Sequence, residues 1–293
     1  MMLLVGADSE IGAATLRHMA DSGLAAQGTT RRGDRAADSL LPLDLSQPLD
    51  DWTPPSGTWA TCIFAAVPRL AACAADPAGS AFINVTQTLA LTERLVARGI
   101  HTLLLSTNQV FDGREPHMPA DAPRAPVSDY GRQKAEAEAE FERLLAHGEP
   151  VAILRLSKVV SPDIALIHGW VEALSAGEPI RPFADMMMAP VETRLAAEAI
   201  TALMQARAPG IFQLTGPTDV TYEAVACHIA DRIGAAQTLI EAIPAASAGM
   251  PYGATPRHTT LDSRALRDRF GIVPPDPWEV IDRIIRNPGS TRR

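Results

Sequence analysis

The chain has 293 residues, 46% of them hydrophobic, and a formal net charge of −8 at pH 7. This length fits one large α/β domain, or a nucleotide-binding domain with a smaller lobe. A net negative charge argues against a nucleic-acid partner, because such a partner needs a basic face. Three scattered cysteines without a CxxC pair predict a reduced, cytoplasmic protein. No apolar run reaches the length of a membrane span, so no membrane partner is expected.

The first predicted elements are a buried strand, a glycine-containing turn and an amphipathic helix. Residues 2–7 are mostly apolar and run into the sequence Gly6-Ala-Asp-Ser-Glu-Ile-Gly12. Glycines permit a tight turn, and the N terminus of the following helix favours the negative charge of a pyrophosphate. The turn therefore predicts a dinucleotide site, with an ordinary strand-to-helix turn as the alternative. The residues expected to contact the cofactor are Gly6, Ser9, Glu10, Ile11 and Gly12.

The second predicted strand, residues 26–30, ends in Arg31 and Arg32. A Rossmann-like site that prefers NAD usually has an acid at this position, which binds the ribose hydroxyls. Two guanidinium groups would instead pair with a 2′-phosphate. The sequence thus predicts NADP(H) as the preferred cofactor and NAD(H) as the second choice. The alternative is a pair of solvated arginines at a strand end.

The most informative stretch begins with the predicted strand 101–107, which ends in Ser106 and Thr107. A proline-rich loop follows, and then a predicted helix that carries Tyr130 and Lys134. Four residues make about one helical turn, so the phenol and the ammonium share one face of the helix. The chain has 26 lysines and arginines, of which only Lys134 and Lys158 are lysines. A lysine at this position therefore indicates a need for a compact ammonium, although a surface Tyr and Lys on an amphipathic helix is the alternative.

These motifs carry a family resemblance. Ser106-Thr107, the following Val-Phe-Asp-Gly, the proline-rich loop and Tyr-Gly-x-x-Lys resemble the active-site segment of the extended short-chain dehydrogenase/reductases. Within these, the sequence is most similar to the dTDP-4-dehydrorhamnose reductase branch. The resemblance implies an α/β fold with a Rossmann-like doubly wound parallel sheet in residues 1–160, to which the chain returns around 190–215. Residues 161–293 are expected to form mainly a smaller substrate-binding lobe.

The resemblance also implies roles for individual residues. Tyr130 would protonate the substrate carbonyl, and Lys134 would lower the pKa of Tyr130 and hold the nicotinamide ribose. Thr107, with Ser106 as second choice, would hydrogen-bond the same carbonyl oxygen. The resemblance adds further cofactor contacts at Asp44, Leu45, Ala65 and Ala66, and substrate contacts at Asn108, Gln109 and Arg257. The alternatives are a cap of the next segment for Asp44, simple packing for the alanines and a surface position for Arg257.

The residues after Thr107 discriminate among related enzymes. The similar nucleotide-sugar dehydratases have Asp and Glu there, whereas Asn108 and Gln109 are amides that exchange no protons at neutral pH. The rhamnose reductases usually have Asp and Tyr, so the sugar itself stays open. The predicted function is an NADPH-dependent reductase of a keto group on a nucleotide-linked sugar.

Two other functions remain open. One is an NAD(P)-dependent sugar-nucleotide epimerase, which uses the same Tyr and Lys. The other is a non-catalytic nucleotide-binding subunit similar to the regulatory subunit of some methionine adenosyltransferases. The presence of Tyr130 and Lys134 argues against it. Ser9, which replaces the middle glycine of the family's phosphate loop, and Gln109, which replaces the reductases' usual Tyr, leave it open. Homodimers are common in the family, so a homodimer is considered. The seven histidines have no metal-ligand spacing, and no metal site is predicted.

Three further expectations concern packing. Asn84 is expected to open a long helix that runs to Arg98, either as its cap or, as the family resemblance implies, as a residue that helps shape the active site. The four glutamates at 136, 138, 140 and 142 are expected to be mostly solvated, because they spread around their helix. The methionines at 186–188 are expected to pack in a core, or alternatively to line a substrate pocket.

Overall fold

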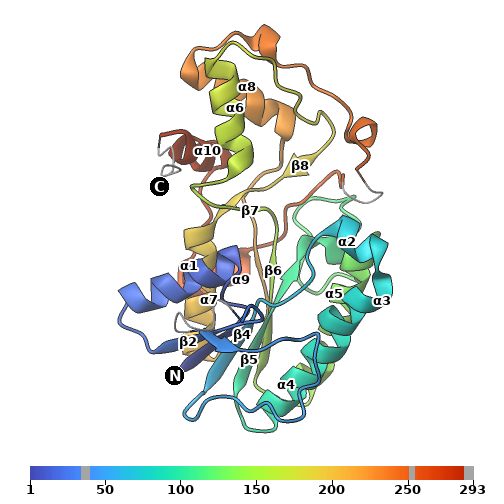
Figure 1. Cartoon of the computed structure of the whole chain (residues 1–293), viewed down its shortest axis with the longest axis vertical. Helices are drawn as coiled ribbons and strands as arrows, with labels where there is room; N and C mark the ends of the chain where they lie inside the picture. Colours follow the sequence, from blue (N-terminus) through green and yellow to red (C-terminus); the bar gives the residue numbers. More distant parts are fainter. Residues whose placement is uncertain (34–39, 251–254, 287–293) are drawn as a thin grey trace.

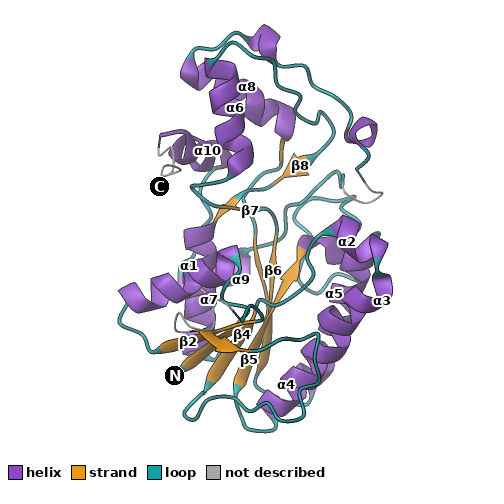
Figure 2. Cartoon of the chain, in the orientation of Figure 1, coloured by secondary structure: helices purple, strands orange, loops and turns teal. Residues whose placement is uncertain are grey.

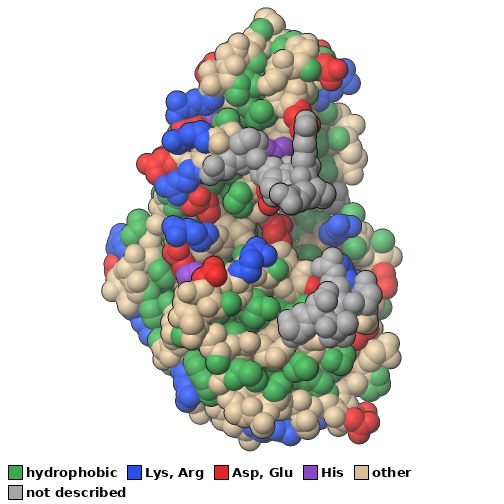
Figure 3. Space-filling view, turned by 60° about the vertical axis from the view of Figure 1, so that its left-hand side comes forward, with side chains coloured by type: hydrophobic (Ala, Val, Ile, Leu, Met, Phe, Trp, Pro, Cys, Tyr) green, Lys and Arg blue, Asp and Glu red, His purple; other side chains and the backbone are tan. Residues whose placement is uncertain are grey.

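The structure is a computed structural model of the chain, and it describes residues 1–33, 40–250 and 255–286. A sheet with helices on both faces forms the larger part, and a smaller, mostly helical part lies beyond one end of the strands (Figure 1). No helix among the described residues is long and apolar enough to cross a membrane. Basic and acidic side chains are mixed over the face in Figure 3 and form no large patch of one sign.

The central sheet has seven strands, all parallel, in the order β10-β6-β5-β4-β1-β2-β3. The chain moves outward from β1 in one direction and then returns to add strands on the other side of it. This is the doubly wound, Rossmann-like arrangement, so the predicted fold class is confirmed. The strands are β1 (Met2–Val5), β2 (Ala26–Thr30), β3 (Leu40–Pro42), β4 (Ala60–Ile63), β5 (His101–Thr107), β6 (Val151–Leu156) and β10 (Gly210–Leu214).

Helices cover both faces of the sheet (Figure 2). One face carries α1 (Glu10–Asp21), α7 (Thr193–Ala206) and α9 (Arg264–Phe270). The other carries α2 (Leu70–Ala75), α3 (Pro77–Ala81), α4 (Thr88–Val96) and α5 (Asp129–Ala146). Strands buried on both faces are expected to be apolar throughout, which explains runs such as Leu103-Leu104-Leu105.

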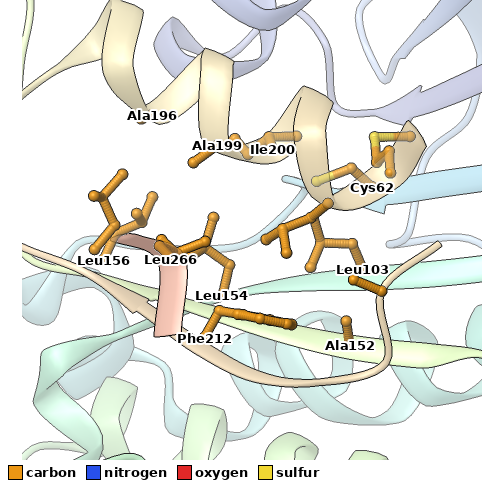
Figure 4. Close-up of a cluster of buried hydrophobic side chains, with 14 of the residues drawn as sticks. Cys62, Leu103, Ala152, Leu154, Leu156, Ala196, Ala199, Ile200, Phe212 and Leu266 are labelled. Atoms are coloured by element: carbon orange, nitrogen blue, oxygen red, sulfur yellow. The ribbon is translucent and has the colours of Figure 1, made fainter. Parts of the chain in front are cut away.

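Alternate residues of each strand enter two different cores. Leu103 and Leu154 pack against Ile200 of α7 in the cluster of Figure 4. Their neighbours Leu104 and Ile153 point to the opposite face and pack with α5. This alternation fixes the register of the sheet, because a slip of one residue would exchange the two faces.

A separate group of elements forms what we call the small lobe, at the top of Figure 1. Its own apolar cluster includes Trp170, Ile229 and Ile281, one from each of its three helices. Two short two-stranded sheets join it to the larger part. The small lobe contains α6 (Ala165–Ser175), α8 (Tyr222–Ile233), α10 (Pro277–Arg286), β7 (Val159–Val160) with β9 (Val191–Glu192), and β8 (Met187–Met188) with β11 (Val220–Thr221).

The expectation for Asn84 was wrong, and the expectation that the four glutamates are mostly solvated has one exception, Glu138. Asn84 does not open a helix, because it lies inside a helical run, in a π-helical segment between α3 and α4 (Phe82–Gln87). Glu138 is fully buried rather than solvated, and it forms an ion pair of 2.7 Å with the equally buried Arg155. Glu138 lies one turn after Lys134, so it shares the inward face of α5.

Candidate active site

A cavity of about 810 Å³ lies at the carboxyl ends of the central strands, between the sheet and the small lobe. In open α/β sheets, ligands bind at this end, where the strand order reverses. The lining side chains come from the turn after β1, the ends of β4, β5 and β6, the start of α5 and the small lobe. They include Ser9, Glu10, Ile11, Ala66, Arg69, Ser106, Thr107, Asn108, Gln109, Tyr130, Lys134, Lys158, Met186, Met187, Tyr222, Pro256 and Thr259.

Tyr130 and Lys134 both face this cavity from the first turns of α5. The Ser128 side chain caps the helix by accepting a hydrogen bond from the backbone N–H of Gly131. Lys134 is only 3% exposed, and its Nζ donates to the carbonyl oxygen of Leu105 at 2.8 Å. Burial lowers the pKa of Lys134 to about 8, although the nearby Glu138 carboxylate acts in the opposite direction. The ammonium is thus fixed beside the end of β5.

The phenol of Tyr130 lies in a different electrostatic environment. Burial raises the pKa of Tyr130 above its ordinary value, and the nearby Cys73 adds to this effect. The expectation that Lys134 lowers the pKa of Tyr130 is therefore wrong for the ligand-free protein, because desolvation of the phenol is the dominant effect. The phenol is therefore protonated at neutral pH in the ligand-free protein. A protonated phenol that faces a cavity can donate a hydrogen bond or a proton to a bound oxygen atom.

Ser106 and Thr107 end β5 and line the same cavity. The Thr107 Oγ1 accepts a hydrogen bond from the backbone N–H of Gln109 at 3.2 Å. The Ser106 side chain is 6% exposed, and its Oγ has no hydrogen-bond partner among residues 1–33, 40–250 and 255–286. The Thr107 hydroxyl also donates a long hydrogen bond of 3.4 Å to Asn108 Oδ1, which a ligand oxygen has to replace. A buried hydroxyl without a partner is uncommon, so the Ser106 hydroxyl has capacity left for a ligand.

Asn108 and Gln109 begin the short 3₁₀ segment after β5 (Asn108–Val110), and both line the cavity. The Gln109 Oε1 accepts a hydrogen bond from Ser128 Oγ at 3.0 Å. Its backbone carbonyl lies so close to Gly131 that a Cβ there would be 2.3 Å away. Gln109 therefore joins the end of β5 to the start of α5, a positioning role that the sequence did not reveal.

The turn after β1 lies at another wall of the cavity. Gly6 has φ +82°, and a Cβ on it would lie 2.9 Å from the backbone nitrogen of Ala65. Ser9 is the N-cap of α1: its Oγ donates to the carbonyl of Gly6 and accepts from the N–H of Gly12. Glu10 and Ile11 follow as the first helical residues, whose N–H groups have no intrahelical partner. The loop has the geometry for a phosphate, with Ser9 as part of the cap.

The residues predicted for the adenosine end lie at the edge of the sheet. Arg31 and Asp44 line a second cavity, of about 290 Å³, at the ends of β2 and β3. Arg32 forms an ion pair of 3.4 Å with Asp8 of the turn after β1. The Leu45 side chain is buried in the core, so only its backbone can contact a ligand there.

Asn84 positions a wall of the main cavity instead of capping a helix. Its side chain accepts from the backbone N–H of Val67 at 2.7 Å and donates to Gln133 Oε1, also at 2.7 Å. Gln133 directly precedes Lys134 on α5. These bonds hold the segment after β4 against the helix that carries Tyr130.

Other lining residues differ from the sequence prediction. Arg257 is exposed and is absent from the lining, whereas its neighbours Pro256 and Thr259 belong to it. The sequence did not single out Arg69. Lys158 was notable as one of two lysines and as part of a segment that resembles the family's stretch past the nicotinamide, and Thr259 lies in a C-terminal stretch that resembles the reductase branch. Met186 and Met187 line the cavity, while Met188 packs in the small lobe, so both expectations for the methionines hold in part. In the described part of the chain, no group of three or more His, Cys, Asp or Glu side chains is placed to hold a metal ion.

Comparison with known families identifies the family to which the chain belongs. A family model described as the RmlD substrate binding domain matches residues 1–287. The chain belongs to this family. The predicted relationship to the dTDP-4-dehydrorhamnose reductase branch is therefore confirmed.

Individual relatives agree with this placement. The chain is 28% identical over 221 residues to a dTDP-4-dehydrorhamnose reductase from Sinorhizobium fredii (strain NBRC 101917 / NGR234), over 71% of this chain and 73% of the relative. It is 24% identical over 225 residues to methionine adenosyltransferase 2 subunit beta from Xenopus tropicalis, over 70% of this chain and 63% of that protein. The solved structure of MoeE5 in complex with UDP-glucose and NAD has a TM-score of 0.79 at 20% identity over 97% of both chains, which shows the shared fold.

Proposed function

We propose that this protein is an NADPH-dependent reductase of a keto group on a nucleotide-linked sugar. The observation that carries the proposal is the convergence of Tyr130, Lys134 and Thr107 on one cavity that also reaches the turn after β1. A hydroxyl, a phenol and an ammonium around a dinucleotide site are the groups that carbonyl reduction needs. The family membership and the reductase relative support the same reaction.

The residues would divide the work as follows. Bound NADPH supplies the hydride that attacks the carbonyl carbon. Tyr130 donates its hydroxyl proton to the carbonyl oxygen, which becomes the alcohol, while Thr107 donates a hydrogen bond to the same oxygen. Lys134 stabilises the resulting phenolate by its charge and holds the nicotinamide ribose. The first turn of α1 binds the pyrophosphate through its free N–H groups, and Arg31 binds the 2′-phosphate.

The reductase relative places reduction ahead of epimerisation. An epimerase uses the same Tyr and Lys, but it must first oxidise its substrate, and for that step Tyr130 has to begin as a base. The epimerase is therefore the second choice.

The alternative of a different class is a non-catalytic subunit. It is supported by the likeness to the methionine adenosyltransferase subunit. Against it stand Tyr130, Lys134 and Thr107, which face one cavity large enough for a substrate.

Substitution Tyr130→Phe tests the proposed function. It removes the proton donor and leaves the ring, so NADPH affinity should stay unchanged while turnover of a nucleotide-linked keto sugar falls by roughly 10²–10⁴-fold. Stopped-flow absorbance measures turnover, and nicotinamide fluorescence measures binding. Equal turnover by both proteins would refute the role of Tyr130; binding without turnover by the wild type, whatever the sugar, would favour the subunit.

A further inference from the structure

The chain's two lysines share one location. Of its 26 lysines and arginines, only Lys134 and Lys158 are lysines, and both line the main cavity. Lys134 is buried and its Nζ donates to a backbone carbonyl. The function proposed above leaves Lys158 without a role.

Lys158 lies next to the reacting groups. It follows β6 by two residues, and the last residue of that strand, Leu156, is the register partner of Thr107 on β5. At about 3.3 Å per residue, Lys158 is within roughly 7 Å of chain from the level of Thr107. Its backbone is fixed by a hydrogen bond from the N–H of Val191 to its carbonyl, at 2.9 Å. Its side chain is exposed and has no ion pair or hydrogen bond with the described residues.

A second cation lies on the other side of β5. Arg69 follows β4, which pairs with β5 on the edge opposite to β6. It also lines the cavity, is exposed and has no side-chain partner in the described part of the chain. Glu10, in the first turn of α1, is the only acid among the described lining residues. The cavity lining therefore carries two positive charges, one on each side of β5, that have no ion-pair partner among the described residues.

We infer that Lys158 and Arg69 bind an oxyanion carried by the sugar itself, so that the preferred substrate is an acidic keto sugar. The inference rests on the proposed function, because the position of the sugar is set by the contact of its carbonyl with Tyr130 and Thr107. A cation beside these two residues therefore contacts the sugar ring that carries the reacting carbonyl. Charge-assisted hydrogen bonds from an ammonium and a guanidinium are the interactions that select a carboxylate or phosphate over a hydroxyl.

The test compares three ligands that do not react, bound to the full chain saturated with NADPH: UDP-glucuronate, UDP-glucose and UDP. UDP-glucuronate has a carboxylate where UDP-glucose has a hydroxymethyl group, and UDP has the nucleoside diphosphate without the sugar. Isothermal titration calorimetry should show that the wild type binds UDP-glucuronate about tenfold more tightly than UDP-glucose, or ~1.4 kcal/mol. Lys158→Met should abolish this preference and leave UDP binding unchanged, and Arg69→Met should reduce it.

Arg98→Met is the matched control, because it removes an exposed charge at the far end of α4 and should keep the preference. Equal affinity of the wild type for the acidic and neutral sugars, including no binding of either, would overturn the inference. Equal weakening of all three ligands by Lys158→Met would also overturn it, because the lysine would then bind the diphosphate. The measurement needs no turnover, so its outcome is separate from the Tyr130→Phe test.

Discussion

Lys134 gives the site a pH dependence that can be worked out from its surroundings. Burial lowers its pKa from 10.5 to about 8 in the ligand-free protein. Below that pH the amine is charged and can bind the ribose and stabilise a Tyr130 phenolate; above it the charge is lost. NADPH affinity should therefore be constant on the acidic side and fall as the pH rises through about 8. Fluorescence titrations between neutral and alkaline pH measure this.

Lys134→Met is the control for that profile. The variant should bind NADPH more weakly at neutral pH and lose the alkaline decline, because no ammonium is left to titrate. An unchanged alkaline decline in Lys134→Met would assign the titration to another group.

At this scale the sequence singled out the candidate reacting groups, which the structure brings to one cavity, but not the residues that position them. Tyr130 and Lys134 were recognisable because helical spacing places residues four apart on one face. The bond from Ser128 to Gln109 and the contact of Gln109 with Gly131 join residues about twenty positions apart. No local pattern encodes such a contact, because it depends on how a loop returns.

Gly131 sets the distance between two elements. A Cβ at this position would lie 2.3 Å from the carbonyl oxygen of Gln109, and backbone atoms there cannot move aside cheaply. Gly131→Ala should therefore destabilise the fold by roughly 1–3 kcal/mol and reduce turnover, because it pushes Tyr130 away from Thr107. Thermal unfolding and steady-state kinetics measure the two effects.

Gly169 of α6 provides the opposite case. It is helical and exposed, and a Cβ there would meet nothing within 4 Å. Gly169→Ala should stabilise the protein by roughly 0.5–1 kcal/mol, because alanine loses less entropy in a helix. If Gly131→Ala and Gly169→Ala shifted the unfolding temperature in the same direction, the contact of Gly131 with Gln109 would not explain the effect of Gly131→Ala.

The buried pair of Glu138 and Arg155 joins α5 to β6 and to the loop beyond β5. Arg155 also donates to the carbonyl of Ala120 and to Gln213 Oε1. Glu138→Gln leaves a buried guanidinium without its counter-charge, which costs about 3–5 kcal/mol in such pairs. The double variant Glu138→Leu with Arg155→Met should lose less free energy of unfolding than the two single variants Glu138→Leu and Arg155→Met lose together. Denaturant unfolding measures this.

The exposed pair of Arg143 and Glu140 on the same helix is the matched control. Solvent already screens both charges, so Arg143→Met should change stability little. Additive effects of the two changes at 138 and 155 would show that the buried pair is not coupled.

Elements with long apolar runs were predictable, and short connections were not. Strands 26–30 and 101–107 were predicted with the bounds that the structure has. The strand expected at 2–7 ends at Val5, because the chain turns at Gly6 with φ +82°. The expectation for Asn84 failed because the helical run begins earlier, at Pro77, after Asp76 as its N-cap.

At the scale of the molecule, the segment 256–262 links the two parts beside the cavity. Leu261 exchanges backbone hydrogen bonds with Thr215 Oγ1, just beyond β10. The backbone N–H of Thr259 donates to Asp219, directly before β11 of the small lobe, at 2.7 Å. A ligand that fills the cavity thus touches groups fixed by both parts. Binding should therefore stabilise the whole fold and not one part alone.

The last prediction uses that coupling to identify the cofactor. A ligand that binds only the folded state stabilises it by about 2.7 kcal/mol at one hundred times its Kd. Arg31 lines the second cavity, at the ends of β2 and β3. NADPH carries a 2′-phosphate that this guanidinium can bind, so NADPH should raise the unfolding temperature more than NADH at equal concentration. Arg31→Ser should reduce the effect of NADPH to that of NADH. Arg17→Ser on the exposed side of α1 should leave both unchanged. Equal stabilisation of the wild type by both cofactors would contradict the assignment of Arg31, because its guanidinium would then not bind the 2′-phosphate.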